Sequence, residues 1–292
     1  MKDLENQGKR EAVLVVSALI RENAARPGGS ARILDVGCGE GQLLAALVDG
    51  HPSTPGITAS AGLDYQMAAL QKARRQYPYL KFIEADYRDP GLLEQAGTFN
   101  IVMLVNTLHE VFSACYQAER GEVDRADGKR QVQAALVNVA RLIEPGGSVV
   151  LFDGVEYPGD LDEQITLRFL NNLALEEFRT FAHEYQALRI TYREYDRGKR
   201  VDLSRRDFTR YITKTIFLGR PLWSRECRES YQYYNEVEFR SALAAAGLEI
   251  RELRYLTVDE EKWQSRVEIE TPGVDFPAEH ILIVAKRPAA GE

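Results

Sequence analysis

The stretch ILDVGCGEGQ, residues 33–42, decides the fold. Its apolar run ends at Asp35, and three glycines follow at alternate positions, Gly37, Gly39 and Gly41. A short apolar run stopped by glycine predicts a buried strand. A turn this rich in glycine lets a ligand approach the backbone, and the helix predicted after it offers free amide groups at its N-terminus. The stretch therefore predicts a ligand-binding turn in an α/β protein.

Strand and helix patterns alternate on both sides of this turn. Short apolar runs predict four further strands, within residues 60–65, 81–86, 99–106 and 147–155. Helical spacing of apolar residues predicts four helices, around residues 14–20, 42–50, 66–77 and 129–143. Strands separated by helices imply a parallel sheet with right-handed crossovers and helices on both faces. Ligands of such sheets bind at the carboxyl ends of the strands.

The composition is that of a globular protein. With 292 residues, of which 45% are hydrophobic, the chain can form one large domain or a domain with an inserted lobe. The formal charge of −7 disfavours a dedicated nucleic-acid binder. The charged N-terminal segment is typical of neither a signal peptide nor a membrane span. Cys38, Cys115 and Cys227 are odd in number and far apart, so we expect no disulfide framework and a cytoplasmic location.

Residues 33–42 resemble motif I of the class I S-adenosylmethionine (SAM)-dependent methyltransferases. A dinucleotide-binding turn would read G-x-G-x-x-G, whereas the glycines here follow G-x-G-x-G behind an aspartate. The later strand ends agree with the resemblance, because Asp64 ends the second predicted strand and Asp86 follows the third. The segment LIEPGGSVVLFD, residues 142–153, is similar to the turn and fifth strand of the family. The resemblance covers residues 31–154.

The resemblance implies a fold, a cofactor and a set of binding residues. The implied fold is α/β, a Rossmann-like seven-stranded mostly parallel sheet with helices on both faces, and the implied cofactor is SAM. By position in the motifs, Asp64 is expected to bind the ribose hydroxyls and Asp86 the adenine amino group. The expected cofactor-binding residues are Asp35, Gly37, Cys38, Gly39, Gly41, Asp64, Tyr65, Asp86, Tyr87 and Asn106.

The tail of the chain completes the family pattern after an insertion. Residues 236–256 read as a helix, a glycine stop and a strand, and a last apolar strand follows. About 80 residues, 156–235, separate this helix from the fifth strand, and their apolar spacing is helical over 167–190. We therefore expect a methyltransferase domain, residues 1–155 and 236–292, with an inserted mainly helical lid over the substrate site. A homodimer interface is the alternative role for the insertion.

The insertion is locally basic and rich in tyrosine. From Arg179 to Arg228 there are 13 Lys and Arg against 6 Asp and Glu. The tyrosines of this part of the chain are Tyr185, Tyr192, Tyr195, Tyr211, Tyr231, Tyr233 and Tyr234. Basic and aromatic side chains together suit an aromatic or anionic small molecule. The alternatives are a solvated face that pairs with the acidic remainder of the chain and, disfavoured because the basic excess is local, RNA.

Four polar residues follow the predicted fourth strand, where the family places substrate-facing groups: Asn106, Thr107, His109 and Glu110. The N-P-P-Y motif of amide and adenine methylation is absent. Methyl transfer from SAM needs mainly positioning, because the sulfonium is already activated. A hydroxyl nucleophile also needs a base that titrates near neutrality, which suits His109. We expect catalysis by His109 as the base, with Glu110 as an orienting group. A structural His109 is the alternative.

Together these patterns predict an enzyme, a SAM-dependent methyltransferase acting on an oxygen or nitrogen atom of a small molecule. No spacing of His, Cys and carboxylates predicts a metal site, and the carboxylate cluster of a metal-dependent catechol methyltransferase cannot be assembled from the sequence. Two alternatives stay open, an RNA or protein methyltransferase and a SAM-binding regulatory protein without transfer activity. A nicotinamide-dependent dehydrogenase is disfavoured by the position of the third glycine.

Overall fold

The computed structural model describes residues 7–157, 159–257 and 260–289. Seven strands form its main sheet: β1 (Ile33–Val36), β2 (Ala61–Asp64), β3 (Lys81–Glu84), β4 (Phe99–Val105), β7 (Ile143–Gly154), β11 (Glu249–Leu256) and β13 (His280–Lys286). Their order is β11-β13-β7-β4-β1-β2-β3, and β13 runs antiparallel to both of its neighbours while the β3-to-β7 pairs are parallel. The expected seven-stranded, mostly parallel sheet is confirmed.

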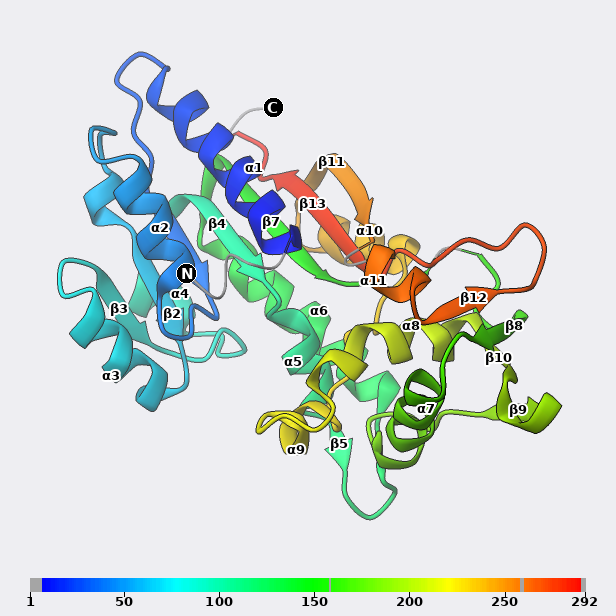
Figure 1. The fold of residues 1–292 in the computed structure, drawn as a ribbon. Helices are drawn as coiled ribbons and strands as arrows, with labels where there is room; N and C mark the ends of the chain where they lie inside the picture. The colour runs from blue at the N-terminus through cyan, green and yellow to red at the C-terminus, as the bar shows by residue number, and fades with distance from the viewer. Residues whose placement is uncertain (1–6, 158, 258–259, 290–292) are drawn as a thin grey trace.

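Helices cover both faces of this sheet (Figure 1). On one face lie α1 (Gln7–Ala24), α2 (Gln42–Gly50) and α3 (Met67–Gln76). On the other lie α4 (Leu92–Ala96), α5 (Leu108–Ser113), α6 (Arg125–Arg141) and α10 (Glu236–Ala245). A short 3₁₀ helix (Ile57–Ala59) precedes β2, and a small hairpin of β5 (Tyr116–Gln117) and β6 (Glu122–Val123) precedes α6.

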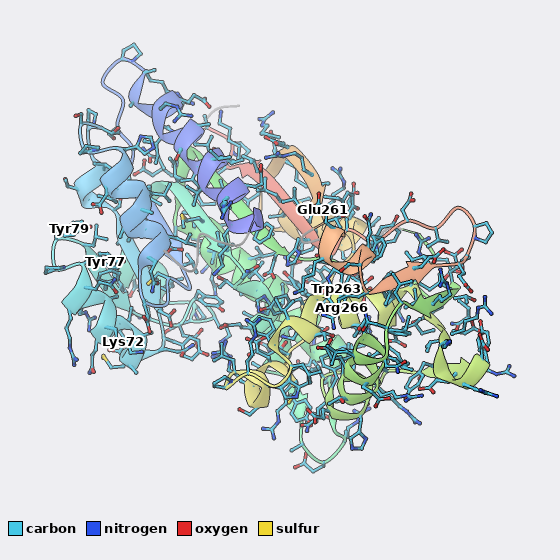
Figure 2. The ribbon with its side chains drawn as sticks, in the orientation of Figure 1. Lys72, Tyr77, Tyr79, Glu261, Trp263 and Arg266 are labelled. Carbon is cyan, nitrogen blue, oxygen red and sulfur yellow. The ribbon has the colours of Figure 1, made fainter. Side chains whose placement is uncertain are left out.

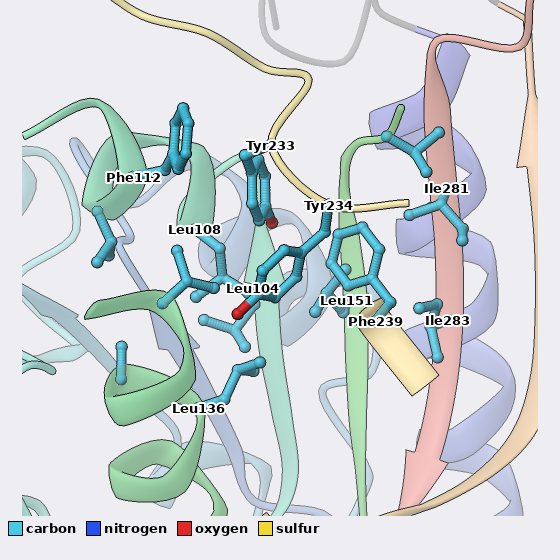
Figure 3. Packing of buried hydrophobic residues seen from close by; sticks show 14 of the residues in the cluster. Leu104, Leu108, Phe112, Leu136, Leu151, Tyr233, Tyr234, Phe239, Ile281 and Ile283 are labelled. Atoms are coloured by element: carbon cyan, nitrogen blue, oxygen red, sulfur yellow. The ribbon is translucent and has the colours of Figure 1, made fainter. Parts of the chain in front are cut away.

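The main sheet is buried on both faces because alternate side chains of its strands enter two separate hydrophobic clusters. Ile101 and Met103 of β4 pack with α1 and α2, whereas Val102 and Leu104 of the same strand pack with α5 and α6. This is why these strands read as continuous apolar runs in the sequence rather than as alternating ones. Figure 3 shows the second cluster, with Leu104 among side chains of α5, α6 and α10.

A smaller lobe is built on a second sheet. Its strands are β8 (Gln164–Phe169), β9 (Tyr192–Tyr195), β10 (Arg200–Ser204) and β12 (Val267–Ile269). They are ordered β12-β8-β10-β9, and every pair is antiparallel. The helices of the lobe are α7 (Asn172–Glu184), α8 (Arg205–Lys214), α9 (Trp223–Glu226) and α11 (Glu260–Gln264), with short 3₁₀ helices at Asp196–Gly198 and Thr215–Phe217.

The lobe differs from the expected mainly helical insertion, because its helices pack on an antiparallel sheet. The strand signal was present in the sequence as alternation: in β8 the side chains of Ile165, Leu167 and Phe169 are buried and those between them are not. The lobe also takes β12 from the tail of the chain, which pairs with β8. The domain division at 156–235 stays a prediction.

The lobe rests on the main sheet through a run of tyrosines. Tyr233 and Tyr234 precede α10 and enter the same hydrophobic cluster as Phe112 and Phe239 (Figure 3). In the view of Figure 2, Trp263 lies where α11 approaches α8, far from Tyr77, Tyr79 and Lys72 at the β3 edge. This junction places the lobe beside the carboxyl ends of β4 and β7.

Across the described part of the chain, no helix is both long and apolar enough to cross a membrane.

Candidate active site

The glycines of the first turn are required for two reasons. Gly37, Gly39 and Gly41 have φ values of 76°, 52° and 81°, a region that favours glycine. A Cβ atom on Gly37 would stand 2.7 Å from the Thr107 side chain, and one on Gly41 would stand 2.8 Å from the ring of Phe82. A Cβ atom on Gly39 would meet open space within 4 Å. The outer two glycines are therefore needed for packing, and the middle one leaves the backbone exposed to a ligand.

Asp64 is held in place by this turn. Its Oδ2 accepts a hydrogen bond from the Gly39 amide at 2.8 Å, and its Oδ1 accepts one from the Gln66 amide at 2.8 Å. The side chain is buried although it ends a strand. Tyr65, the next residue, is 47% exposed at the rim. The carboxylate is thus fixed in orientation beside the bare backbone of the turn, as a ribose-binding residue would need to be.

Two adjoining cavities open at the turn, and we call them the turn cavities. The smaller, of about 210 Å³, is lined by Gly37, Gly39, Asp64, Tyr65, Gln66, Ala69, Tyr87, Asn106, Thr107, Glu110 and Arg225. The larger, of about 390 Å³, is lined by Lys9, Asp35, Gly37, Cys38, Gly39, Glu40, Gln42, Leu43, Val105 and Asn106. Two glycines of the turn and Asn106 line both. Most of the predicted cofactor-binding residues therefore come together here.

Asp35 is an unusual carboxyl group in the larger turn cavity. Burial raises its pKa to about 7, an effect that the positive charge of Lys9 opposes and the negative charge of Asp64 adds to. Cys38 lies beside it and is also buried, packed so closely on β2 that a Cβ atom on Gly62 would stand 2.7 Å from its Sγ. Burial raises the pKa of the Cys38 thiol, so the thiol is kept protonated.

Asp86 and Tyr87 are oriented differently from each other. The carboxylate of Asp86 accepts hydrogen bonds from Nε of Arg88 at 2.9 Å and from its Nη2 at 2.5 Å. Burial raises the pKa of Asp86, but Arg88 outweighs this and leaves it lowered. Asp86 lines neither turn cavity, so its contact with adenine stays a prediction. Tyr87 does line the smaller one, buried, with its hydroxyl donating to the Thr107 carbonyl at 3.3 Å.

Asn106 combines two features that accompany binding sites. Its φ of 53° lies in the left-handed region, which is uncommon for a residue other than glycine. Its side-chain oxygen Oδ1 is buried and has no hydrogen-bond partner among the described residues. The backbone amide of Asn106 donates to the Phe152 carbonyl at 2.8 Å, which ties the strained residue to β7. An unpaired buried oxygen at the meeting point of cavities is suited to a ligand donor.

A third cavity, of about 510 Å³, lies between the main sheet and the lobe, and we call it the lobe cavity. It meets the smaller turn cavity at Asn106, Glu110 and Arg225. Its lining residues are Lys9, Asn106, His109, Glu110, Ile212, Thr213, Ile216, Phe217, Arg220, Leu222, Arg225, Glu226, Tyr231, Trp263, Glu279 and His280. The helices α8 and α9 of the lobe contribute much of one wall, as the expected lid would.

His109 lines this cavity and is paired with a carboxylate. Its Nδ1 lies 2.7 Å from Oδ1 of Asp153, the residue before the last one of β7. Oδ2 of Asp153 accepts hydrogen bonds from the backbone amides of Leu108 and His109 at 2.8 and 3.1 Å, and the Tyr233 hydroxyl lies 3.4 Å from it. Both members of the pair are buried. Sequence reasoning missed Asp153, although it ends the fifth strand at the expected sheet edge.

Opposing influences set the pKa of His109. Burial lowers this pKa, whereas the charge and hydrogen bond of Asp153 raise it, and the net shift is upward. For the neighbouring Glu110, burial raises the pKa; the charge of His109 lowers it, and the net shift is again upward. Glu110 Oε1 lies 3.7 Å from Nη2 of Arg225 on α9, so the residue faces the lobe. His109 therefore has the surroundings of a strengthened base.

The aromatic wall beside His109 comes from the lobe. The ring of Tyr231 lies 3.8 Å from the His109 ring, and Lys214 Nζ lies 4.1 Å from the Tyr231 ring centroid. Lys214 is fully buried and pairs with Glu226 at 2.5 Å. Of the tyrosines noted in the sequence, Tyr231 is the one that lines the lobe cavity.

Much of the basic excess of the lobe is used within the lobe. Arg179 pairs with Glu194 at 2.7 Å, and Arg205 pairs with Glu163 at 2.7 Å. Two arginines, Arg220 and Arg225, line the lobe cavity. Arg225 lies 3.1 Å from a carboxylate oxygen of Glu229 as well as near Glu110. The described residues also contain no cluster of three or more His, Cys, Asp or Glu side chains able to hold a metal ion.

The sequence of residues 33–123 matches the family model described as a methyltransferase domain. This match covers the glycine turn, Asp64, the Asp86 loop and His109, and the strand order of the main sheet has the arrangement that the resemblance implied. Residues 33–123 are thus a methyltransferase domain, as the resemblance implied. SAM is the cofactor that the resemblance implies, and the turn cavities are where we expect it to bind.

Solved structures similar to this chain are remote from it in sequence. An O-methyltransferase family protein from Burkholderia thailandensis is 13% identical over 97% of this chain and 59% of its own, with a TM-score of 0.47. A SAM-dependent methyltransferase from Mesorhizobium loti is 16% identical over 94% of this chain and 98% of its own, with a TM-score of 0.49. The sugar N-methyltransferase KedS8 from Streptoalloteichus is 20% identical over 95% of this chain and 87% of its own, with a TM-score of 0.45.

The chain spans about three fifths of the Burkholderia protein. The comparison with curated proteins gave no match. The likeness to methyltransferases rests on the domain match, the glycine turn and the strand order.

The expected binding of SAM gives a first test. Asp64→Ala removes a carboxylate that the turn fixes in a largely enclosed site, and loss of its hydrogen bonds to ribose is expected to cost about 1–3 kcal/mol, which is roughly 5- to 150-fold in Kd. Calorimetric titration with SAM measures this. Asp89→Ala, whose carboxylate lies outside both turn cavities and accepts from the Gly91 amide, is the matched control. Unchanged affinity in a folded Asp64→Ala protein would overturn the ribose assignment.

Proposed function

We propose that the enzyme transfers the methyl group of SAM to an oxygen or nitrogen atom of a small molecule bound in the lobe cavity. The observation that carries this proposal is His109 on the wall of that cavity, with its Nδ1 held by the buried carboxylate of Asp153. His109 adjoins Glu110 in the chain, and Glu110 and Asn106 line both the lobe cavity and the smaller turn cavity. A base on this wall would face an acceptor that occupies the lobe cavity next to the bound cofactor.

The proposed step is a displacement at the methyl carbon. SAM held in the turn cavities would supply an activated methyl group, and the acceptor's oxygen or nitrogen would bond to that methyl carbon as its bond to sulfur breaks, the electron pair staying on sulfur. The nucleophile's proton passes to Nε2 of His109, because Nδ1 is bonded to Asp153. Asp153 itself is fixed by two backbone amides, so it holds the imidazole in one orientation and stabilises the imidazolium that forms.

The enclosure of the site favours a small acceptor. A cavity of about 510 Å³ has the size of a small-molecule site. The basic side chains Arg179 and Arg205 are paired inside the lobe, which leaves little of the continuous positive surface that RNA would need. We propose that residues 156–235, with β12, act as the lid of this cavity. A regulatory SAM-binding protein would have no need of a buried base facing a second cavity.

Transfer of label from methyl-tritiated SAM to a panel of metabolites tests the proposal. We expect label in a low-molecular-weight product, and we expect none in total RNA or in protein from the same extract. Label that stays in RNA or protein would replace the small-molecule assignment with one of the alternatives. Tight SAM binding with no labelled product from any fraction would favour the regulatory protein.

A further inference from the structure

A second histidine of the lobe cavity has no part in the proposed step. His280 begins β13, is 6% exposed and lines the cavity opposite the lobe helices. Its ring stacks on Phe152 at 5.1 Å between centroids with an interplanar angle of 10°. Among the described residues, its buried Nδ1 has no hydrogen-bond partner. A buried polar ring without partners is costly unless something else binds it.

The surroundings of His280 indicate which nitrogen is open. Nδ1 lies 3.9 Å from Oε1 of Glu279, so a proton on Nδ1 is directed toward a carboxylate. That tautomer leaves the lone pair on Nε2 to accept a hydrogen bond. In His109 it is likewise Nδ1 that faces a carboxylate, there in a hydrogen bond of 2.7 Å to Asp153. The lobe cavity is thus lined by two imidazoles that both present an acceptor.

The two imidazoles are close enough to contact one small molecule. Both flank the ring of Tyr231, which lies 3.8 Å from the His109 ring and 6.4 Å from the His280 ring. Burial lowers the pKa of His280 to about 4, partly opposed by Asp153 and assisted by the charge of His109, so the ring is neutral near pH 7. A neutral ring in the acceptor tautomer attracts a donor and offers nothing to an anion.

The other charged groups of the cavity agree with a donor-bearing ligand. Carboxylates of Glu110, Glu226 and Glu279 line it. The side-chain oxygen of Asn106 is a further acceptor without a partner. Of the lining cations, Arg225 is engaged by Glu229 and Glu226, Arg220 is exposed, and Lys9 also lines the larger turn cavity. The lining therefore has as many carboxylates as Lys and Arg side chains, and Asn106 adds an unpaired acceptor. This balance does not favour the anionic substrate predicted from the basic composition.

We propose that His280 is a substrate-binding and specificity-determining residue that accepts a hydrogen bond from a second hydroxyl or amino group of the acceptor molecule. The first such group is the one methylated at His109. The substrate class is then a neutral or cationic small molecule with two donor groups a few bonds apart, such as a diol or an amino alcohol. This inference rests on the proposed function, because it takes the lobe cavity to be the acceptor site.

Binding of simple probes to the protein loaded with S-adenosylhomocysteine tests the inference. The probes are catechol and 2-aminophenol with two donors, guaiacol with one, 1,2-dimethoxybenzene with none, and benzoate as an anion. Ligand-observed NMR gives their affinities. We expect the two-donor probes to bind about three- to tenfold more tightly than the capped ones, the effect of one net hydrogen bond. Equal binding of capped and uncapped probes, a preference for benzoate, or no binding of any probe would each overturn the inference.

Two variants assign the effect to His280. His280→Phe keeps a ring to stack on Phe152 but has no nitrogen, and it should remove the preference for two-donor probes. His280→Gln retains an acceptor oxygen and should restore part of the preference. If His280→Phe fails to fold, the probe series on the unaltered protein still tests whether the cavity prefers two-donor ligands. Failure of the proposed function has a separate signature, because probes would then bind with the expected preference while no probe or metabolite becomes methylated.

Discussion

His109→Ala is expected to lower the turnover of methyl transfer by about 10²–10⁴ while SAM affinity stays nearly unchanged. The reason is geometric: His109 faces the lobe cavity, whereas the residues that fix the turn cavities are Asp64 and the glycines. Initial rates with saturating SAM and the acceptor found by labelling give the turnover, and calorimetry gives the SAM affinity. Asp153→Asn serves as a companion, since it preserves shape but removes the charge that raises the pKa of His109.

The pH profile separates a base from a packing residue. The proton of His109 must be absent for catalysis, so the rate should rise with pH through the His109 pKa, which lies above its ordinary value. His109→Ala should lose this ascending limb, and Asp153→Asn should move it to lower pH. Folding stability also depends on this pKa. Because the pKa of His109 is raised, its protonation stabilises the folded state at low pH, and this stabilisation is lost as pH rises through the folded-state pKa.

A packing role for His109 makes a different prediction. The folded fraction of His109→Ala would then fall, but the enzyme that remains folded would turn over at the normal rate. Thermal unfolding of the variant, with rates corrected for folded protein, distinguishes the two roles. Normal turnover per folded molecule would remove His109 from the mechanism and leave Glu110 and Tyr231 as the next residues to test, since both line the same cavity.

SAM affinity is expected to fall about fivefold between pH 7 and pH 6, and about 50-fold between pH 7 and pH 5. Asp35 is the cause: burial raises its pKa to about 7, with Lys9 opposing and Asp64 adding to the shift, so the free enzyme holds a neutral carboxyl group below that pH. SAM brings a sulfonium and an ammonium group, and two positive charges near Asp35 favour its ionised form. Binding should therefore release a proton.

Titration calorimetry in buffers of different ionisation enthalpy measures the released proton directly. Asp35→Asn is the matched variant: it should bind SAM more weakly than the unaltered enzyme at pH 8 and show no slope between pH 5 and 7. A flat affinity in the unaltered enzyme would mean that Asp35 is ionised without the cofactor or that SAM does not approach it. The folding stability of the free enzyme should change with pH in the direction opposite to SAM affinity. Because the pKa of Asp35 is raised, its carboxyl stabilises the fold below the unfolded-state pKa, and this stabilisation is lost as pH rises toward 7.

The parts of the site that sequence could predict are those held by local geometry. A strand followed by Gly37, Gly39 and Gly41 has few backbone solutions, and Asp64 at the next strand end is brought to the same sheet edge by the parallel order. The position of His109 at this sheet edge could be predicted for the same reason, because His109 follows β4. These residues are close to the turn in space because consecutive parallel strands end on one side.

The residues that sequence reasoning missed depend on long-range contacts. Asp153 pairs with His109 across 44 positions of the chain, and His280 reaches the cavity from the last strand. In the lobe, the helical periodicity around α7 was correct, but β8 acquires its strand pairing from β10 and from Val267 of β12, about 100 positions away. Apolar alternation in so short a segment does not distinguish a strand with distant partners from a helix edge.

Because β12 comes from the tail of the chain, the lobe is built from two segments that are separated in the sequence and therefore in the gene. Val267 pairs with Phe169, and the fully buried Trp263 packs on Tyr211 at 5.1 Å, so both halves of the lobe are needed to close its core. A graft of residues 156–235 alone into another scaffold would leave one edge of β8 open to pairing with other molecules. Any exchange of acceptor specificity by recombination must therefore move two separated coding segments together, 156–235 and the one that encodes α11 and β12.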